Sequence, residues 1–208
     1  MDDLLARWRL LHPGADAVAV DAWGRDLLAL WQQPHRRYHD VLHLTEVLNR
    51  VDLLAHHARD ADAVRLAAWT HDAVYDPPAA AGANEAASGD VAREVLTDLG
   101  HPSARDVVRL VLLTATHDAR QDDPDGQVLC DADLGVLAAD DERYAGYAAA
   151  VRAEYAHVPD DAFAAGRSAV LEQLLGHDRL FATSTAHDLW ERRARANVEA
   201  ELLALRHR

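Results

Sequence analysis

Apolar residues recur at intervals of three and four along most of the chain, which is the spacing of one face of an α-helix. Val91, Val95 and Leu99 show this spacing in the middle of the chain, and the same spacing runs from Trp190 to Leu202. No segment sustains the strict alternation of a half-buried β-strand. The pattern therefore predicts an all-α fold.

Helix-breaking residues divide this pattern into segments of helical length. Examples are Pro34, the pair Pro77-Pro78, and the polar run from Gln121 to Gly126. The sequence predicts ten helices, over residues 2–11, 15–32, 37–58, 60–75, 84–99, 102–117, 128–139, 141–157, 160–176 and 184–206. Because neither an internal repeat nor a low-complexity linker interrupts them, we expect a single domain over residues 1–208.

Composition and charge narrow the range of functions. The 208 residues carry 21 basic and 35 acidic side chains, a formal net charge of -14, and every basic residue is an arginine. The absence of lysine excludes Schiff-base chemistry and a phosphate-loop lysine, and the negative charge argues against binding to a nucleic-acid backbone. The single cysteine, Cys130, excludes an internal disulfide and is interpreted as a core residue. No run approaches the roughly 18 apolar residues of a membrane span, so we expect a cytoplasmic protein that does not bind membranes.

Thirteen histidines are an unusual number for a chain of this length. Two of them, His39 and His43, lie four residues apart within the predicted helix 37–58, which places them on one helix face. This spacing would let one imidazole bind a metal ion while the other faces the same cavity. Two solvated histidines are the alternative.

Acidic side chains occur in apolar helical surroundings at two further places. His71-Asp72 ends an apolar run, where buried polar neighbours need partners. A divalent cation would satisfy both side chains, and a helix-capping aspartate beside a hydrogen-bonded core histidine is the alternative. In the second place, either Asp131 or Asp133 caps the predicted helix 128–139 while the other points inward.

Three features occur in order along the chain: a histidine on one helix, a His-Asp pair 28 residues later (His43 to His71), and a distant aspartate on a further helix. This order resembles the pattern of the HD superfamily of metal-dependent phosphohydrolases. Five segments in the same order resemble a bacterial group of predicted HD phosphohydrolases. They are residues 36–39, 69–77, 84–88, 131–134 and 152–158.

This resemblance implies an HD-type helical bundle with its metal-site core at about 35–140 and further helices at about 141–208. It also implies a divalent metal ion, one of Mn, Mg, Fe, Co, Ni or Zn, as cofactor. The implied metal ligands are His43, His71, Asp72 and Asp133. Two groups of relatives, the cyclic-nucleotide phosphodiesterases and the deoxynucleotide triphosphohydrolases, use an aspartate in the position of Asp133, which leaves Asp131 outside the ligand set.

Further roles follow from the same likeness and from neighbouring residues. Similarity to the phosphodiesterases implies that His39 is the general acid. The family pattern makes Glu85 a candidate base or supporting carboxylate, with a first-turn helix acid as the alternative. His117 is a candidate contact for phosphate or a second metal, with a surface histidine as the alternative. Arg36 and Arg37 have the planar guanidinium that suits phosphate oxygens, unless they are simply solvated.

These residues predict a metal-dependent phosphohydrolase that cleaves a phosphate ester or anhydride of a small molecule or nucleotide. The expected partner is therefore a small phosphorylated substrate, and a homodimer is left open. Asp40 and Tyr75 depart from the phosphodiesterase pattern, so cyclic-nucleotide hydrolysis is not implied. Two other functions remain as alternatives: an HD-type di-iron oxygenase, and a metal- or nucleotide-binding module without catalysis.

Overall fold

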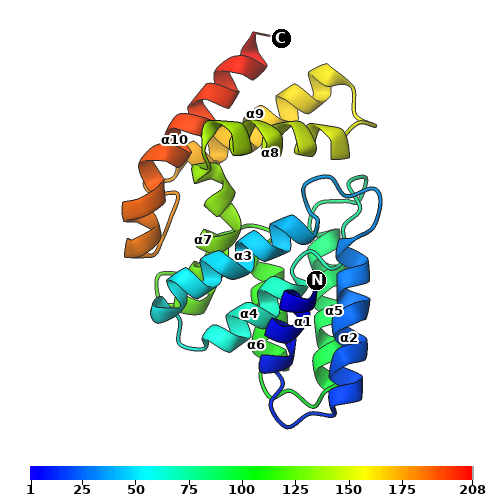
Figure 1. The fold of residues 1–208 in the computed structure, drawn as a ribbon. Coiled ribbons are helices and arrows are strands. Elements are labelled where there is room, and N and C mark those ends of the chain that lie inside the picture. Colours follow the sequence, from blue (N-terminus) through cyan, green and yellow to red (C-terminus); the bar gives the residue numbers. More distant parts are fainter. Residues whose placement is uncertain (208) are drawn as a thin grey trace.

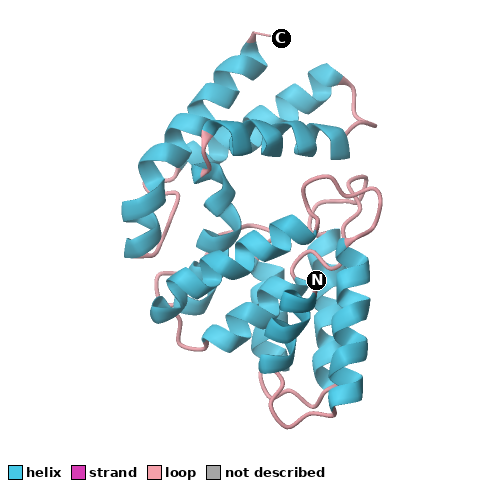
Figure 2. Ribbon diagram, in the orientation of Figure 1, coloured by secondary structure: helices cyan, strands magenta, loops and turns pink. Residues whose placement is uncertain are grey.

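The computed structural model describes residues 1–207 and, within that range, contains ten α-helices and no β-strand (Figures 1 and 2). The α-helices are α1 (Asp2–Leu10), α2 (Ala17–Trp31), α3 (Val41–Leu54), α4 (Ala61–Thr70), α5 (Ala83–Asp98), α6 (Ala104–Leu113), α7 (Pro124–Leu134), α8 (Asp141–Glu154), α9 (Asp160–Gly176) and α10 (Ser184–Arg206), and two short 3-10 helices are η1 (Ala55–His57) and η2 (Gly135–Ala138). The predicted all-α fold of about ten helices is confirmed. Across these residues, no helix is at once long enough and apolar enough to traverse a bilayer.

The helices form two groups around a continuous apolar core (Figure 1). In the first group α3, α4 and α7 pack against one another, and α5 packs against α6. In the second, α10 packs against α9 and η2, and α8 also contacts η2. Three tryptophans, Trp8, Trp31 and Trp69, are completely buried in the core. The mutual packing of α3, α4 and α7 brings side chains from distant parts of the sequence together.

Helix α3 begins at Val41, four residues later than the sequence predicts. Asp40 is extended and its carboxylate accepts hydrogen bonds from the backbone N–H groups of Leu42 and His43, which makes it the N-cap. His39 therefore precedes the helix, and the prediction that His39 and His43 share one helix face is wrong. Their rings still approach each other, with centroids 5.5 Å apart.

Helix α7 begins at Pro124, four residues earlier than the predicted start at residue 128. Asp123 caps it by accepting a hydrogen bond from the Gly126 N–H, and proline fits the first helical position. Asp131 and Asp133 consequently both lie inside the helix. The prediction that one of them caps the helix is wrong, because the cap is supplied upstream.

Two other helices end before their predicted limits and leave polar residues in turns. Helix α4 ends at Thr70 rather than 75, so that His71 and Asp72 follow it directly. Helix α6 ends at Leu113 rather than 117, and His117 adopts a positive φ of 52° in the turn beyond it. A left-handed conformation is uncommon for a residue with a Cβ, and this one turns the chain toward α7.

A buried histidine that follows α1 makes the stability of the fold dependent on pH. His12 is 5% exposed, neither of its ring nitrogens has a hydrogen-bond partner among residues 1–207, and its ring centroid lies 5.4 Å from that of His101. Burial, together with His101, lowers the pKa of His12 to about 4 from 6.5. Between these values the unfolded chain binds the proton and the folded chain does not. We therefore expect the free energy of unfolding to fall by roughly 2–3 kcal/mol as the pH decreases from 7 to 4 on account of this residue.

Chemical denaturation of the wild type and of His12→Phe at several pH values tests this expectation. The variant should lose this part of the pH dependence, because phenylalanine fills the site without a titrating group. The same replacement at the exposed His177 is the matched control. An unchanged pH dependence in His12→Phe would show that His12 is not responsible.

Candidate metal centre

Three helices deliver a compact group of imidazole and carboxylate side chains. His43 lies in the first turn of α3, His71 directly follows α4, and Asp133 is near the end of α7. One ligand atom from each lies within 4.8 Å of the others, so this group could hold a metal ion. The two Nε2 atoms are 3.2 Å apart, and Asp133 Oδ1 is 3.2 Å from His43 Nε2 and 3.6 Å from His71 Nε2.

Asp72 joins the same group from the turn after α4. Its Oδ2 lies 3.3 Å from His71 Nε2 and 3.7 Å from His43 Nε2. The structure thus brings together all four residues that the sequence predicts as metal ligands. Two imidazole nitrogens and two carboxylates form a mixed donor set that suits a divalent transition metal ion.

Hydrogen bonding orients His71 for ligation. Its Nδ1 lies 2.9 Å from the Ala68 carbonyl oxygen, which can only accept, so Nδ1 carries a hydrogen and Nε2 is the nitrogen that faces the group and would bind a metal ion. Burial disfavours the charged form of His71, but Asp72 and Asp133 outweigh it and raise its pKa to about 9. The carboxylates thus produce a negative local potential, which a divalent cation would neutralise.

The two aspartates of α7 have different surroundings. Asp133 Oδ1 faces the two histidines, and its Oδ2 is 2.7 Å from His117 Nε2. Although burial opposes ionisation, these three imidazoles, with His71 foremost, hold the pKa of Asp133 well below its usual range. Asp131 instead accepts hydrogen bonds of 2.8 Å from the backbone N–H groups of Ala182 and Thr183. Asp133 faces the candidate metal centre, and Asp131 anchors the segment that leads into α10.

Because Asp131 and Asp133 have different partners, we expect Asp131→Ala to lose stability and Asp133→Ala to lose metal affinity. Asp131→Ala should lower the free energy of unfolding by about 1–3 kcal/mol, because the Thr183 N–H is left buried without a partner. It should retain metal binding. Asp133→Ala should lose metal affinity instead. Denaturation of the metal-free proteins and elemental analysis of the reconstituted ones measure the two effects, and loss of metal in Asp131→Ala alone would reverse the assignment.

His39 lies at the edge of the group and is held by Glu154 of α8. The His39 Nδ1 is 2.8 Å from Glu154 Oε2, while its Nε2 lies 4.0 Å from Asp72 Oδ2. Because a carboxylate accepts, Nδ1 donates and Nε2 faces the metal centre. Burial opposes the charged form of His39, but the hydrogen bond to Glu154 and nearby carboxylates outweigh burial and raise its pKa.

Glu154 holds the whole loop that precedes α3. Its Oε1 accepts hydrogen bonds of 2.8–3.0 Å from the backbone N–H groups of residues 37–39, and its Oε2 also accepts one from the Tyr75 hydroxyl at 3.0 Å. Despite burial, these donors, with His39 first, lower the pKa of Glu154 to about 2. Glu154 lies in the 152–158 segment that carries the family resemblance, and from the sequence it could belong either to a substrate wall or to a structural ion-pair network. Glu154 continues the buried face of α8 formed by Tyr144, Tyr147 and Val151, and this spacing is the sequence signal that favours a structural role.

The two predicted phosphate-binding arginines have other surroundings. Arg36 is buried, and its guanidinium donates to the backbone carbonyls of His39, Asp72 and Ala73 at 2.8–2.9 Å. These bonds link the loop before α3 to the turn after α4, which is a structural role. We therefore do not retain Arg36 as a substrate ligand. Arg37 is exposed and does not line the cavity described below, which likewise does not support the predicted contact.

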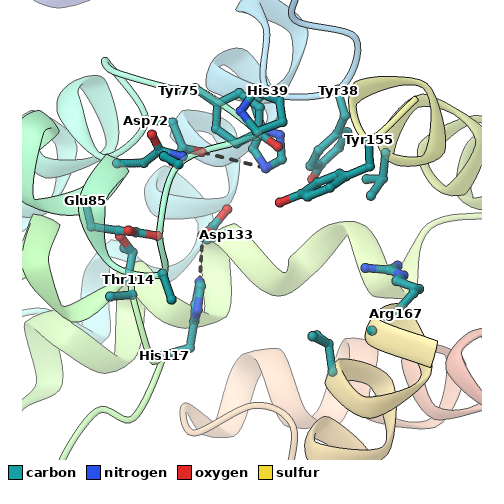
Figure 3. A pocket seen from close by; sticks show the side chains of 18 of the residues that line it. Tyr38, His39, Asp72, Tyr75, Glu85, Thr114, His117, Asp133, Tyr155 and Arg167 are labelled. Atoms are coloured by element: carbon teal, nitrogen blue, oxygen red, sulfur yellow. Dashed lines mark hydrogen bonds and ion pairs between the residues drawn. The ribbon is translucent and has the colours of Figure 1, made fainter. Parts of the chain in front are cut away.

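A cavity of about 790 Å³ opens onto the group (Figure 3). His39, Asp72 and Asp133 line it on one side, and His117 and Glu85 lie farther along the same side. His117 contacts the group through Asp133, whereas no hydrogen bond within residues 1–207 links Glu85 to it. Their predicted catalytic roles stay predictions.

No protein-family model, curated protein or solved structure was found to match this chain. The function of the chain is therefore inferred from its sequence and from the geometry of the candidate metal centre.

Proposed function

We propose that this chain is a metal-dependent phosphohydrolase, the function that its resemblance to the HD superfamily implies. The observation that carries the proposal is the approach of His43, His71, Asp72 and Asp133 from three parts of the fold to one point at the end of a cavity. A structural role does not explain four such groups at the same place, because buried ionisable side chains are costly without compensation.

The donor set fits a divalent cation held by the two Nε2 atoms and the two carboxylates. When bound, such a cation supplies positive charge for the phosphoryl oxygens and lowers the pKa of a nearby water. The cavity gives a phosphate ester access to this point through Asp72 and Asp133.

The side chains of the protein would carry out the proton transfer in this reaction. Water forms the new bond to phosphorus as the bond to the leaving oxygen breaks, and His39 donates its Nε2 proton to that oxygen. Glu154 keeps His39 in the required orientation through the bond at Nδ1. The proton lost by the water passes to solvent, and general acid help of this kind contributes about 100- to 10,000-fold.

The test is phosphate release by protein reconstituted separately with Mn, Mg, Fe, Co, Ni and Zn, against a panel of phosphomonoesters, nucleotides and inorganic polyphosphates. His71→Gln, prepared identically, controls for contaminating phosphatases. Metal-dependent release that is absent from the control would support the proposal. Dioxygen consumption by the iron form would instead support an oxygenase, and nucleotide binding without turnover would support a module that has no catalysis.

A further inference from the structure

The wall of the cavity that α8 and α9 form is largely apolar, although Tyr147, Tyr155, Arg167 and Gln173 also belong to it. It is built from α8, α9 and the segment that joins them, and η2, which directly follows α7, adds apolar residues beside it. The apolar side chains include Leu137, Val151, Val158, Phe163, Val170 and Leu174. Val170 is 51% exposed, which is high for a valine that lines a cavity. This wall leaves apolar surface available to a ligand.

The same cavity has little positive charge for a polyanion. Arg167 is the single arginine that lines it among the residues that the structure describes, and the chain has no lysine. The Arg167 guanidinium already forms an ion pair with Glu201, at 2.8 Å, and donates to the Tyr147 hydroxyl. Three carboxylates, Asp72, Glu85 and Asp133, line the cavity as well. Asp72 and Asp133 would be compensated by the cation, so beyond the metal centre the second and third phosphates of a di- or triphosphate would meet Glu85 and, apart from His39 and His117, few donors.

We infer, on the basis of the proposed function, that the substrate is a phosphate monoester whose leaving group is largely apolar. Its phosphate lies at the metal centre, and its apolar body lies against the wall formed by α8 and α9. A cavity of about 790 Å³ has the size of sites that enclose small organic ligands. Burial of the leaving group against this wall removes apolar surface of both ligand and protein from water.

Calorimetric titration with n-alkylphosphonates, from methyl to hexyl, tests the inference without turnover, because their carbon–phosphorus bond resists hydrolysis. Both the Mn²⁺-loaded and the metal-free protein are titrated. Each buried methylene should raise the affinity about two- to fourfold, so that hexylphosphonate binds roughly 30-fold or more tightly than methylphosphonate. An affinity independent of chain length, or tighter binding of tripolyphosphate than of hexylphosphonate, would overturn the inference.

Val170→Glu places a charge on the proposed wall, and Val18→Glu is its matched control. Val18 is 77% exposed on α2 and does not line the cavity, so both variants replace an exposed helical valine with the same side chain. Val170→Glu should weaken hexylphosphonate binding about tenfold or more, with a much smaller effect on methylphosphonate. Val18→Glu should leave both affinities unchanged. An equal loss for the two ligands in Val170→Glu would show charge repulsion rather than apolar contact and would overturn the inference.

Turnover measurements separate this inference from the proposed function. If no metal form hydrolyses any ester but the chain-length trend persists in the metal-free protein, the proposed function fails and the apolar ligand site stands. If methyl phosphate or nucleoside triphosphates are hydrolysed with a kcat/KM as high as that of hexyl phosphate, the proposed function stands and the inference fails.

Discussion

Asp72→Asn is expected to lower metal-dependent phosphate release by roughly 100-fold or more while the protein remains folded. The amide keeps the size of the side chain but removes the negative charge that lies 3.3 Å from His71 Nε2. The fold should survive, since the link between this turn and Arg36 is made by the Asp72 backbone carbonyl and not by its carboxylate.

Elemental analysis and initial rates on the best substrate measure the two expected effects, and thermal unfolding of the metal-free protein checks the fold. Asp76→Asn is the matched control, because Asp76 is an exposed carboxylate in the same loop and does not line the cavity. Wild-type metal content together with a wild-type rate in Asp72→Asn would refute the assignment of Asp72 to the metal centre.

His39→Ala and His43→Ala are expected to fail in different ways. His43 Nε2 lies 3.2–3.7 Å from the ligand atoms of three other residues in the group, so His43→Ala should lose metal affinity first. His39 Nε2 reaches the group only through Asp72, at 4.0 Å. His39→Ala should therefore keep stoichiometric metal and lower the rate by roughly 100-fold or more, as expected when a general acid is removed.

Bound metal and turnover are measured for both variants, with the exposed His56→Ala as a control. Metal loss in His39→Ala with retention in His43→Ala would invert the two roles. A normal rate in His39→Ala would transfer the acid role to His117 or Glu85. Glu154→Gln tests whether Glu154 positions His39. If it does, this variant should retain its metal, and its kcat should decrease with little change in KM.

Several helix boundaries illustrate where local sequence information is incomplete. The N-caps Asp40 and Asp123 are both visible in the sequence, yet either aspartate could equally occupy a turn. Selection of Asp40 as the cap is reinforced by Glu154, which holds the N–H groups of residues 37–39 from a helix more than a hundred positions away. Local patterns cannot reveal such a partner.

The helical fold and the residue types of the candidate metal centre could both be predicted from the amino-acid pattern. Periodic apolar residues make helices wherever one face can be buried, and histidine and aspartate in apolar surroundings indicate a shared partner. The tertiary structure alone decided that Asp133 faces this centre while Asp131 binds the Ala182 and Thr183 N–H groups. The structural role of Arg36 and the apolar wall of the cavity likewise became visible only in the tertiary structure. The packing of helices that are distant in the sequence determines which side chains meet, and a local pattern does not specify that packing.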